Sequence, residues 1–492
     1  MTQSARRIRV RTSVLILGAL ATACGTAPVT QRPDLRVEVA KAWAQADSAA
    51  STEGTWWSRL GDASLEALID EAFESNLNLK AASARLRAAQ GQAKIAGAPL
   101  LPQITTGGSG SKRKQVFVGF PIPGAEESGP ASSKSESFGV SLDVSWELDL
   151  WGRLSASRAA AVADRQAAVA TFSGARQSLA AQTSKAWFAL IEAQRQVDLS
   201  HATVDNYTTS LRQVEDRYNR GIRPSLDLRL TRSDLAAARD QLYQRQLLLE
   251  RARRQVEVIL GRYPSGHMDA GQTLPTLSEP VPAGIPSEIL GRRPDLIAAE
   301  RRLGSGVMRH KEALRNRFPR ITLTGSTGRT SETLSDLSRG DFTVWNFAAG
   351  LLQPLFQGGR IQGNIDLTQA LRDEALANYI GTVLRAFAEV ENALAAEELL
   401  NAREAELTIA AEEASAARML SENRYQRGIT DLITMLQAQR AAYLTESQLL
   451  SLKRQRLDAR IDLHLALGGD FKSREDVLSS RPTTESAGET TR

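Results

Sequence analysis

Hydrophobic and polar residues alternate without a break from residue 140 to residue 150, which read VSLDVSWELDL. Apolar side chains occupy every even position, and serine, aspartate or glutamate every odd one. Successive side chains of a β-strand lie on opposite faces, so this segment predicts a strand with one apolar and one polar face. A membrane barrel contains such strands, with lipid outside and water inside, but a soluble sheet with one wet face contains them too.

Three further segments predict strands with a less regular pattern. They cover residues 101–106, 318–327 and 342–355, and the last reads FTVWNFAAGLLQPL. Residues 107–137 and 328–340 between the strands are polar and rich in glycine and serine, which is typical of exposed loops. Four strands cannot close a barrel, and lipid does not tolerate open strand edges, so a membrane barrel requires several chains. A homotrimer would supply twelve strands.

After each strand pair the hydrophobic period becomes that of a coiled coil. Gly152-Arg153 opens a proline-free stretch of about 64 residues, which as one helix would be roughly 96 Å long. The return segment repeats apolar residues at sevens, at Leu228, Leu235, Leu242, Leu249 and Val256. The outgoing helix has apolar or small residues at steps of three and four, with only Ser200 interrupting: Ala186, Leu190, Ala193, Val197, Val204, Tyr207, Leu211, Val214 and Tyr218.

One hexapeptide pattern occurs twice, as RYNRGI at 217–222 and as RYQRGI at 424–429, 207 positions apart. Earlier landmarks recur at 217 positions, and loops absorb such a length difference more readily than packed elements do. The spacings predict two tandem copies of one unit, each with a helical hairpin whose turn needs a left-handed residue, Gly221 or Gly428. Two further pairs share the distance of 207: Gly152-Arg153 with Gly359-Arg360, and Leu260-Gly261 with Leu467-Gly468.

The N-terminus reads MTQSARRIRVRTSVLILGALATAC, with four arginines, an apolar run and the only cysteine of the chain. This pattern predicts a secretory signal over residues 1–23. The small residues before Cys24 resemble the lipobox at which bacterial lipoproteins are cleaved and acylated, although an ordinary signal peptide with an unrelated cysteine is an alternative. Without the four arginines, 57 basic residues face 56 acidic ones, so no charge excess favours nucleic acid.

The chemistry-bearing residues predict neither an enzyme nor a metal site nor a cofactor. The histidines at 201, 267, 310 and 464 lack ligand spacing, and no serine and histidine share a catalytic motif. No apolar run of about 18 residues follows the signal, so no transmembrane helix is predicted. The division predicted for the mature chain is an N-terminal extended segment at 24–56, a first repeat at 57–264, a linker at 265–285, a second repeat at 286–470 and a disordered tail at 471–492.

Four motifs together resemble the TolC-like outer-membrane efflux family, in its lipoprotein branch of NodT/OprM-like outer-membrane factors. They are WWSRLGDASLEALIDEAFESNLNL, GRRPDLIAAERRL, PLFQGGR and RYQRGI with the Leu-Gly ending. The resemblance implies a mixed α and β membrane protein: a homotrimer forms a twelve-stranded barrel in the outer membrane, continued by a long α-helical periplasmic barrel. It implies a passive exit duct for drugs, metals or other small solutes, coupled to a periplasmic adaptor and an inner-membrane pump of the RND or a related type.

The resemblance also implies a gate at the periplasmic hairpin turns. Tyr425 matches the family's tyrosine in the second hairpin, and Asp227 matches an acidic position of the first. Three copies of Asp227 would form a ring that attracts cations. This chain departs from the family pattern in having Gln437 at a position that is commonly aspartate, and Thr434 is the counterpart of Asp227 in the second repeat. Closure would then depend more on Tyr218, Tyr425, Arg220 and Arg427, whose alternative role is to cap helix ends.

Three other functions remain open at this stage. An outer-membrane duct for type I protein secretion would have the same architecture, since partners rather than the duct select the cargo. A periplasmic coiled-coil scaffold without a pore would explain the heptads but neither the strand pairs nor the repeat. A helical-bundle enzyme would need a catalytic constellation that the sequence does not offer.

Overall fold

The computed structural model describes residues 42–43, 55–118, 132–271, 273–277, 281, 284 and 286–469. Cys24, the predicted signal and the predicted tail lie outside these residues. The chain divides into two compact units. The sheet unit comprises Met1–Pro33, Ala88–Gln166 and Arg301–Ala377, and the helical unit comprises Asp34–Arg87, Ala167–Glu300 and Asn378–Arg492.

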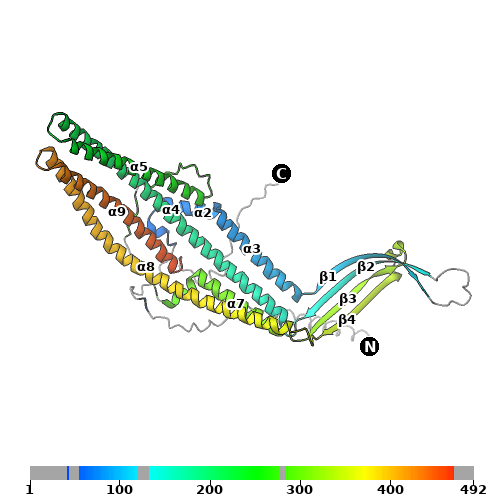
Figure 1. Cartoon of the computed structure of the whole chain (residues 1–492). Helices are drawn as coiled ribbons and strands as arrows, with labels where there is room; N and C mark the ends of the chain where they lie inside the picture. Colours follow the sequence, from blue (N-terminus) through cyan, green and yellow to red (C-terminus); the bar gives the residue numbers. More distant parts are fainter. Residues whose placement is uncertain are drawn as a thin grey trace, which may run out of the picture. The chain divides into compact units, whose positions relative to one another are not determined.

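The same series of elements occurs twice along the chain (Figure 1). The long helices α4 and α8 both have 67 residues, and the return helices α5 and α9 both have 35. The predicted internal repeat is therefore confirmed at the level of individual helices. The first repeat contains α2 (Ala63–Ser75), α3 (Leu77–Gly97), β1 (Gln103–Val116), β2 (Ser132–Leu148), α4 (Arg153–Asn219) and α5 (Ser225–Ile259). The second contains α6 (Ile289–Arg292), α7 (Pro294–Arg315), β3 (Arg320–Ser331), β4 (Thr343–Leu352), α8 (Arg360–Gln426) and α9 (Leu432–Ala466).

The four strands form one antiparallel sheet in the order β1-β2-β3-β4. Its register continues the alternation of β2 onto the next strand, because Trp146 pairs with Leu323 and Leu148 with Ile321. Serine, glycine, aspartate or glutamate occupies every odd position of β2. The sheet therefore has one face with an apolar band and one that is mostly polar. None of the described helices combines the length and apolarity that a membrane span needs.

The extent of the first strand pair differs from the prediction. Residues 107–116 and 132–137, predicted as loop, belong to β1 and β2, and β3 likewise continues to Ser331. These segments are polar, but strand pairing depends on backbone hydrogen bonds, which glycine, serine and lysine supply as well as valine does. The side-chain pattern therefore located the apolar part of each strand and not its end.

Aromatic and charged side chains surround the junction between β2 and α4. The Trp151 ring stacks on Phe318 with the ring centroids 5.2 Å apart, and its indole nitrogen donates to the Pro319 carbonyl at 2.8 Å. Asp149 accepts hydrogen bonds from the backbone amides of Leu154 and Ser155, which are free at the start of a helix. An acidic cap and an aromatic pair thus fix the change from strand to helix.

The heptad positions of α5 form part of the core of the helical unit. All five residues predicted at sevens are buried, with exposures between 0% for Val256 and 8% for Leu242. On α4 the predicted seam is buried or half-buried as far as Val214, and only its last member, Tyr218, is exposed. The predicted coiled-coil seam is therefore confirmed along the hairpin, but it ends before Tyr218 at the turn.

The start of each repeat is hydrogen-bonded to the end of that repeat's last helix. In the first repeat, the Asn76 side-chain amide donates to the Ile259 carbonyl at 2.8 Å. In the second, an Arg293 guanidinium nitrogen donates to the Ala466 carbonyl at 3.1 Å. Asn76 and Arg293 are 217 positions apart, and Ile259 and Ala466 are 207 apart, which are the two repeat distances. Different side chains thus make the equivalent contact.

A tryptophan of the first motif packs against the end of α9. Trp56 is fully buried, and its ring stacks on His464 with centroids 5.7 Å apart. Its indole nitrogen donates to the Gln177 side-chain oxygen at 2.9 Å. Burial first, and then the charges of Arg460 and Arg59, together lower the pKa of His464 to about 3. His464 is therefore a neutral packing residue.

The burial of His464 predicts a pH-dependent stability. Below pH 6.5 the unfolded chain protonates this histidine while the folded chain keeps it neutral, so stability falls as pH falls toward 3. Relative to His464→Gln, the wild type is expected to lose about 1.3 kcal/mol more between pH 7.5 and pH 5.5. Urea unfolding followed by tryptophan fluorescence measures this. His201→Gln, at an exposed position, is the control, and equal pH dependence in His464→Gln and wild type would contradict the assignment.

Candidate functional site

The two hairpin turns have the same backbone geometry. Gly221 and Gly428 have φ angles of 76° and 75°, in the left-handed region. The amide of each glycine donates to the carbonyl three residues back, and the next amide, of Ile222 or Ile429, donates to the carbonyl five residues back. This is the Schellman motif, which ends a helix with its last carbonyls satisfied. Glycine avoids the steric cost that a Cβ would bring at these positions.

The two tyrosines of the hexapeptides differ in their surroundings. Tyr425 is completely buried, whereas Tyr218, its counterpart, is 40% exposed. Two guanidinium groups lie over the Tyr425 ring, that of Arg217 at 4.7 Å and that of Arg223 at 5.3 Å from its centroid. Both distances are in the range of cation–π interactions. Of the two predicted gate tyrosines, only Tyr425 is buried.

Arg217 joins the two hairpins through the end of α8. Its guanidinium donates to the carbonyl of Tyr425 at 3.2 Å and to that of Gln426 at 2.9 Å. These carbonyls are in the last turn of α8, where a cation also meets the negative end of the helix dipole. The arginines predicted for the gate, Arg220 and Arg427, are both exposed. The sequence did hold a signal for Arg217: it lies three residues after the seam residue Val214, so the two share the helical face that packs against the neighbouring helices.

The tyrosine hydroxyl of this cluster has no hydrogen-bond partner among the described residues. The Tyr425 hydroxyl oxygen is inaccessible to solvent and unpaired. Asp227 lies at the start of α5, and its carboxylate is 3.7 Å from an Arg223 guanidinium nitrogen, with its side chain 13% exposed. Arg223 therefore contacts both the aromatic ring and the carboxylate, and brings two predicted gate residues into one cluster.

The second repeat supplies a different cap at the equivalent turn. Asp431 accepts hydrogen bonds from the Thr434 backbone amide at 2.7 Å and from the Thr434 hydroxyl at 3.1 Å. These bonds hold the pKa of Asp431 below its ordinary value. Thr434, predicted as the gate counterpart of Asp227, thus receives the N-cap of α9 from Asp431. Gln437, one turn further along, is exposed.

Behind the turns, a polar network connects α4, α8 and α9. The Gln439 side-chain amide donates to Glu422 at 2.9 Å and to Ser210 at 3.2 Å, and Asn206 donates to the same Glu422 oxygen at 3.0 Å. Gln439 is fully buried. This network was not predicted from the sequence, although a polar residue close to the apolar seam positions Leu432, Met435 and Leu436 is a known signal of fixed register.

An ion pair between α5 and α9 borders the same region. Arg440 donates to Asp234, whose exposure is only 9%. Burial and the nearby Asp234 carboxylate raise the pKa of Tyr207 to about 12, so its hydroxyl stays protonated. These groups line a cavity of about 340 Å³ between α4, α5 and α9. The pairing places the buried Asp234 carboxylate at the contact between hairpins, and loss of the more exposed Arg440 would leave this charge unpaired.

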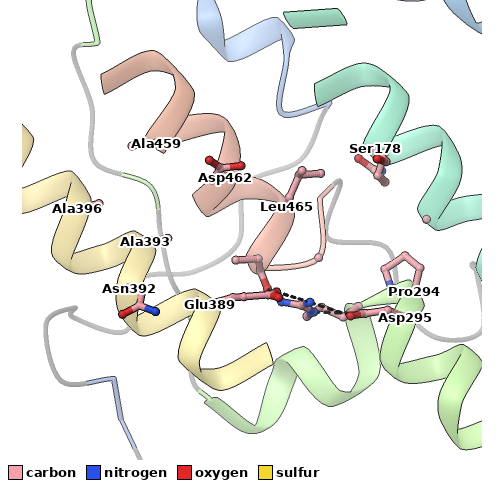
Figure 2. Close-up of a pocket in the computed structure, with 15 residues that line it drawn as sticks. Ser178, Pro294, Asp295, Glu389, Asn392, Ala393, Ala396, Ala459, Asp462 and Leu465 are labelled. Atoms are coloured by element: carbon pink, nitrogen blue, oxygen red, sulfur yellow. Dashed lines mark hydrogen bonds and ion pairs between the residues drawn. The ribbon is translucent and has the colours of Figure 1, made fainter. Parts of the chain in front are cut away.

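A larger cavity, of about 650 Å³, lies at the other end of α9 (Figure 2). In the figure, Asp295 and Glu389 point toward one another, and Arg293 forms ion pairs with both at 2.7 Å. Burial opposes the charge of Arg293, but the two carboxylates offset it and raise its pKa above the ordinary value. Because these two carboxylates balance its charge, the role of Arg293 is to hold helices together rather than to bind a ligand. Arg293, the second arginine of the GRRPDL motif, thus connects α7, α8 and the end of α9.

The chain is similar along almost its whole length to known outer-membrane proteins. The family model described as outer membrane efflux protein matches residues 68–262 and 285–469. Outer membrane protein OprJ of Pseudomonas aeruginosa is 31% identical over 481 residues, covering 95% of this chain and 98% of that protein. The pyoverdine export outer membrane protein OpmQ of the same organism is 29% identical over 486 residues, covering 97% of this chain and 100% of that protein.

A solved structure shows the same fold. The outer-membrane channel OprN superimposes with a TM-score of 0.79 at 28% sequence identity, covering 91% of this chain and 99% of that one. The match includes both repeats, since it extends over nine-tenths of the chain. The sheet and the paired hairpins are therefore features of a known class of structures.

Arg217 is predicted to hold the end of α8 against α4. Arg217→Ala removes two charged hydrogen bonds and one cation–π contact, so the last turn of α8 is expected to open more readily by about 1–2 kcal/mol. Hydrogen exchange at the amides of residues 425–429 measures the change. Arg220→Ala, in the same turn with an exposed side chain, is the matched control and is expected to change opening by less than about 0.5 kcal/mol. Equal protection in Arg217→Ala and wild type would contradict the assignment.

Proposed function

Because this chain belongs to the outer membrane efflux protein family and is an efflux channel of the outer membrane, we propose that it forms the exit duct of a tripartite system. Small solutes would enter it from a periplasmic adaptor and an inner-membrane pump of the RND or a related type, and leave passively. The observation that carries the proposal is the sheet with one apolar and one polar face, in the same chain as two long helical hairpins. The family is one of transport proteins.

The sheet supports assembly as a homotrimer. Its edge strands are β1 and β4, whose outer backbone groups have no strand partner among the described residues. In lipid each unsatisfied backbone group costs several kcal/mol, so the edges must pair. Pairing of β4 with β1 of the next copy closes the sheet, and three copies give the even number of strands, twelve, that such barrels require.

The hairpin turns are the proposed gate. Asp227 with Arg223, together with Arg217 over the Tyr425 ring, would form the closed contact between the two hairpins. Thr434 with Asp431 would cap the second hairpin. The exposed side chains of Tyr218, Arg220, Arg427 and Gln437 would face neighbouring copies or the adaptor. Gly221 and Gly428 permit the tight turns. Opening would then require the Arg217 and Arg223 contacts to separate.

The membrane anchor is proposed from the sequence alone. Cys24 and the signal before it lie outside the described residues. The small residues before Cys24 support cleavage and acylation there, with the acyl chains in outer-membrane lipid. One acyl chain binds membranes only marginally, so the anchor would add to the barrel rather than replace it.

The proposed duct predicts a detergent-extracted trimer that conducts ions. Protein purified from outer membranes is expected to sediment as three chains plus detergent and to produce steady conductance in a planar bilayer. Acylation of its N-terminal peptide at Cys24, absent from Cys24→Ser, is read by mass spectrometry of the same sample. A monomer that stays soluble without detergent would contradict the duct and favour a periplasmic scaffold.

The Asp227 ring predicts a cation preference of the channel. Asp227→Asn removes one negative charge per copy, so the permeability ratio of potassium to chloride is expected to fall by about twofold, a modest change because Arg223 already offsets part of the charge. Reversal potentials in asymmetric salt measure the ratio. Asp240→Asn carries the same charge change on the exposed face of α5 and serves as the control. An unchanged ratio in Asp227→Asn would remove this residue from the ring.

A further inference from the structure

The projecting end of the β1-β2 hairpin carries lysines on the apolar face of the sheet. The register pairs Lys112 with Glu136 and Lys114 with Lys134. Side chains two residues apart on a strand share a face, so these even-numbered residues lie on the same side as Phe138, Val140 and Leu142. Arg113, between the lysines, pairs with Ser135 and lies on the opposite, polar face.

The lysines begin where the apolar band of β2 ends. From Leu148 to Phe138 the strand rises about 33 Å, which a tilt of about 40° reduces to about 25 Å across the membrane, the height of the apolar band of outer-membrane barrels. Lys134 follows four residues further along the strand, roughly 10 Å higher by the same estimate. Lysine stems extend along apolar surface while the ammonium groups seek polar surroundings, so these groups reach the headgroup layer.

Two of these ammonium groups have no carboxylate partner in the part of the chain that the structure describes. Lys112 forms an ion pair with Glu136. Lys114 and Lys134 lie directly opposite each other, and no carboxylate among the described residues pairs with either. Like charges in directly opposed positions destabilise a strand pair. A bridging anion would remove this repulsion.

We propose that Lys114 and Lys134, with Lys112 beside them, bind the phosphate groups of an anionic lipid in the outer leaflet of the membrane. The inference rests on the proposed function, because it requires the apolar face of the sheet to lie in lipid. The phosphates of a lipid have the charge that the lysine pair lacks, and the adjoining apolar band holds the acyl chains of the same molecule. Each copy in the trimer would hold one such site, on the outside of the barrel.

Bisphosphorylated lipid A is the probe for this site. Native mass spectrometry of the full-length trimer in detergent gives the dissociation constant for the lipid. Lys114→Gln/Lys134→Gln is expected to bind about tenfold more weakly than the wild type, since each lysine near an anionic surface contributes to attraction. Arg113→Gln, which loses a charge from the same strand but from the polar face, is expected to bind within about twofold of wild type.

The same experiment separates the possible failures. Unchanged lipid A binding by Lys114→Gln/Lys134→Gln in trimers that conduct ions would overturn the lipid site and leave the duct intact. Equal weakening by Arg113→Gln would show a general charge effect and also overturn it, and displacement of lipid A by millimolar inorganic phosphate would assign the lysines to a free anion. A wild type that neither trimerises nor conducts would overturn the proposed function, and the lipid site with it.

Discussion

A strand edge in lipid must find a partner, and this constraint governs the rest of the protein. The sheet has four strands and two free edges, yet its apolar face is suited to a hydrocarbon environment. Hydrocarbon offers no hydrogen bonds, so the edges force the chain to assemble. The helices then have to associate in the same number as the strands, because each repeat supplies one strand pair and one hairpin. The need to close a sheet thus sets the stoichiometry of the helical part.

The two repeats show how similar sequences acquire different surroundings. Their long helices and their return helices agree in length, and both turns end in the same glycine geometry. Their tyrosines do not agree, because Arg217 and Arg223 of the first hairpin both contact Tyr425 of the second, while Tyr218 is exposed. The pseudo-symmetry of the chain is therefore broken at the hairpin turns. A contact between unlike hairpins can be released without unfolding either helix.

The sequence predicted most of the architecture because the order of residue types shows both the internal repeat and the hydrophobic periods of the helices and strands. The heptads of α5 and the strict alternation in β2 identify buried and lipid-side positions directly. The ends of β1 and β2 could not be predicted, since polar residues pair as strands when the backbone partner is present. The site was harder to predict, because Arg217 and Gln439 contact residues of other helices and Asp431 caps a helix. The hydrophobic period marks such positions at most and does not identify their partners.

The contacts of Asn76 with Ile259 and of Arg293 with Ala466 close each repeat on itself. A module whose beginning lies beside its end can be copied in tandem without rerouting the chain, because the second copy starts where the first one finishes. The ancestral half-chain could then have formed the same wall from twice as many subunits. Fusion of two halves would free each one to diverge, and the unequal tyrosines of the hairpin turns are what such divergence leaves behind.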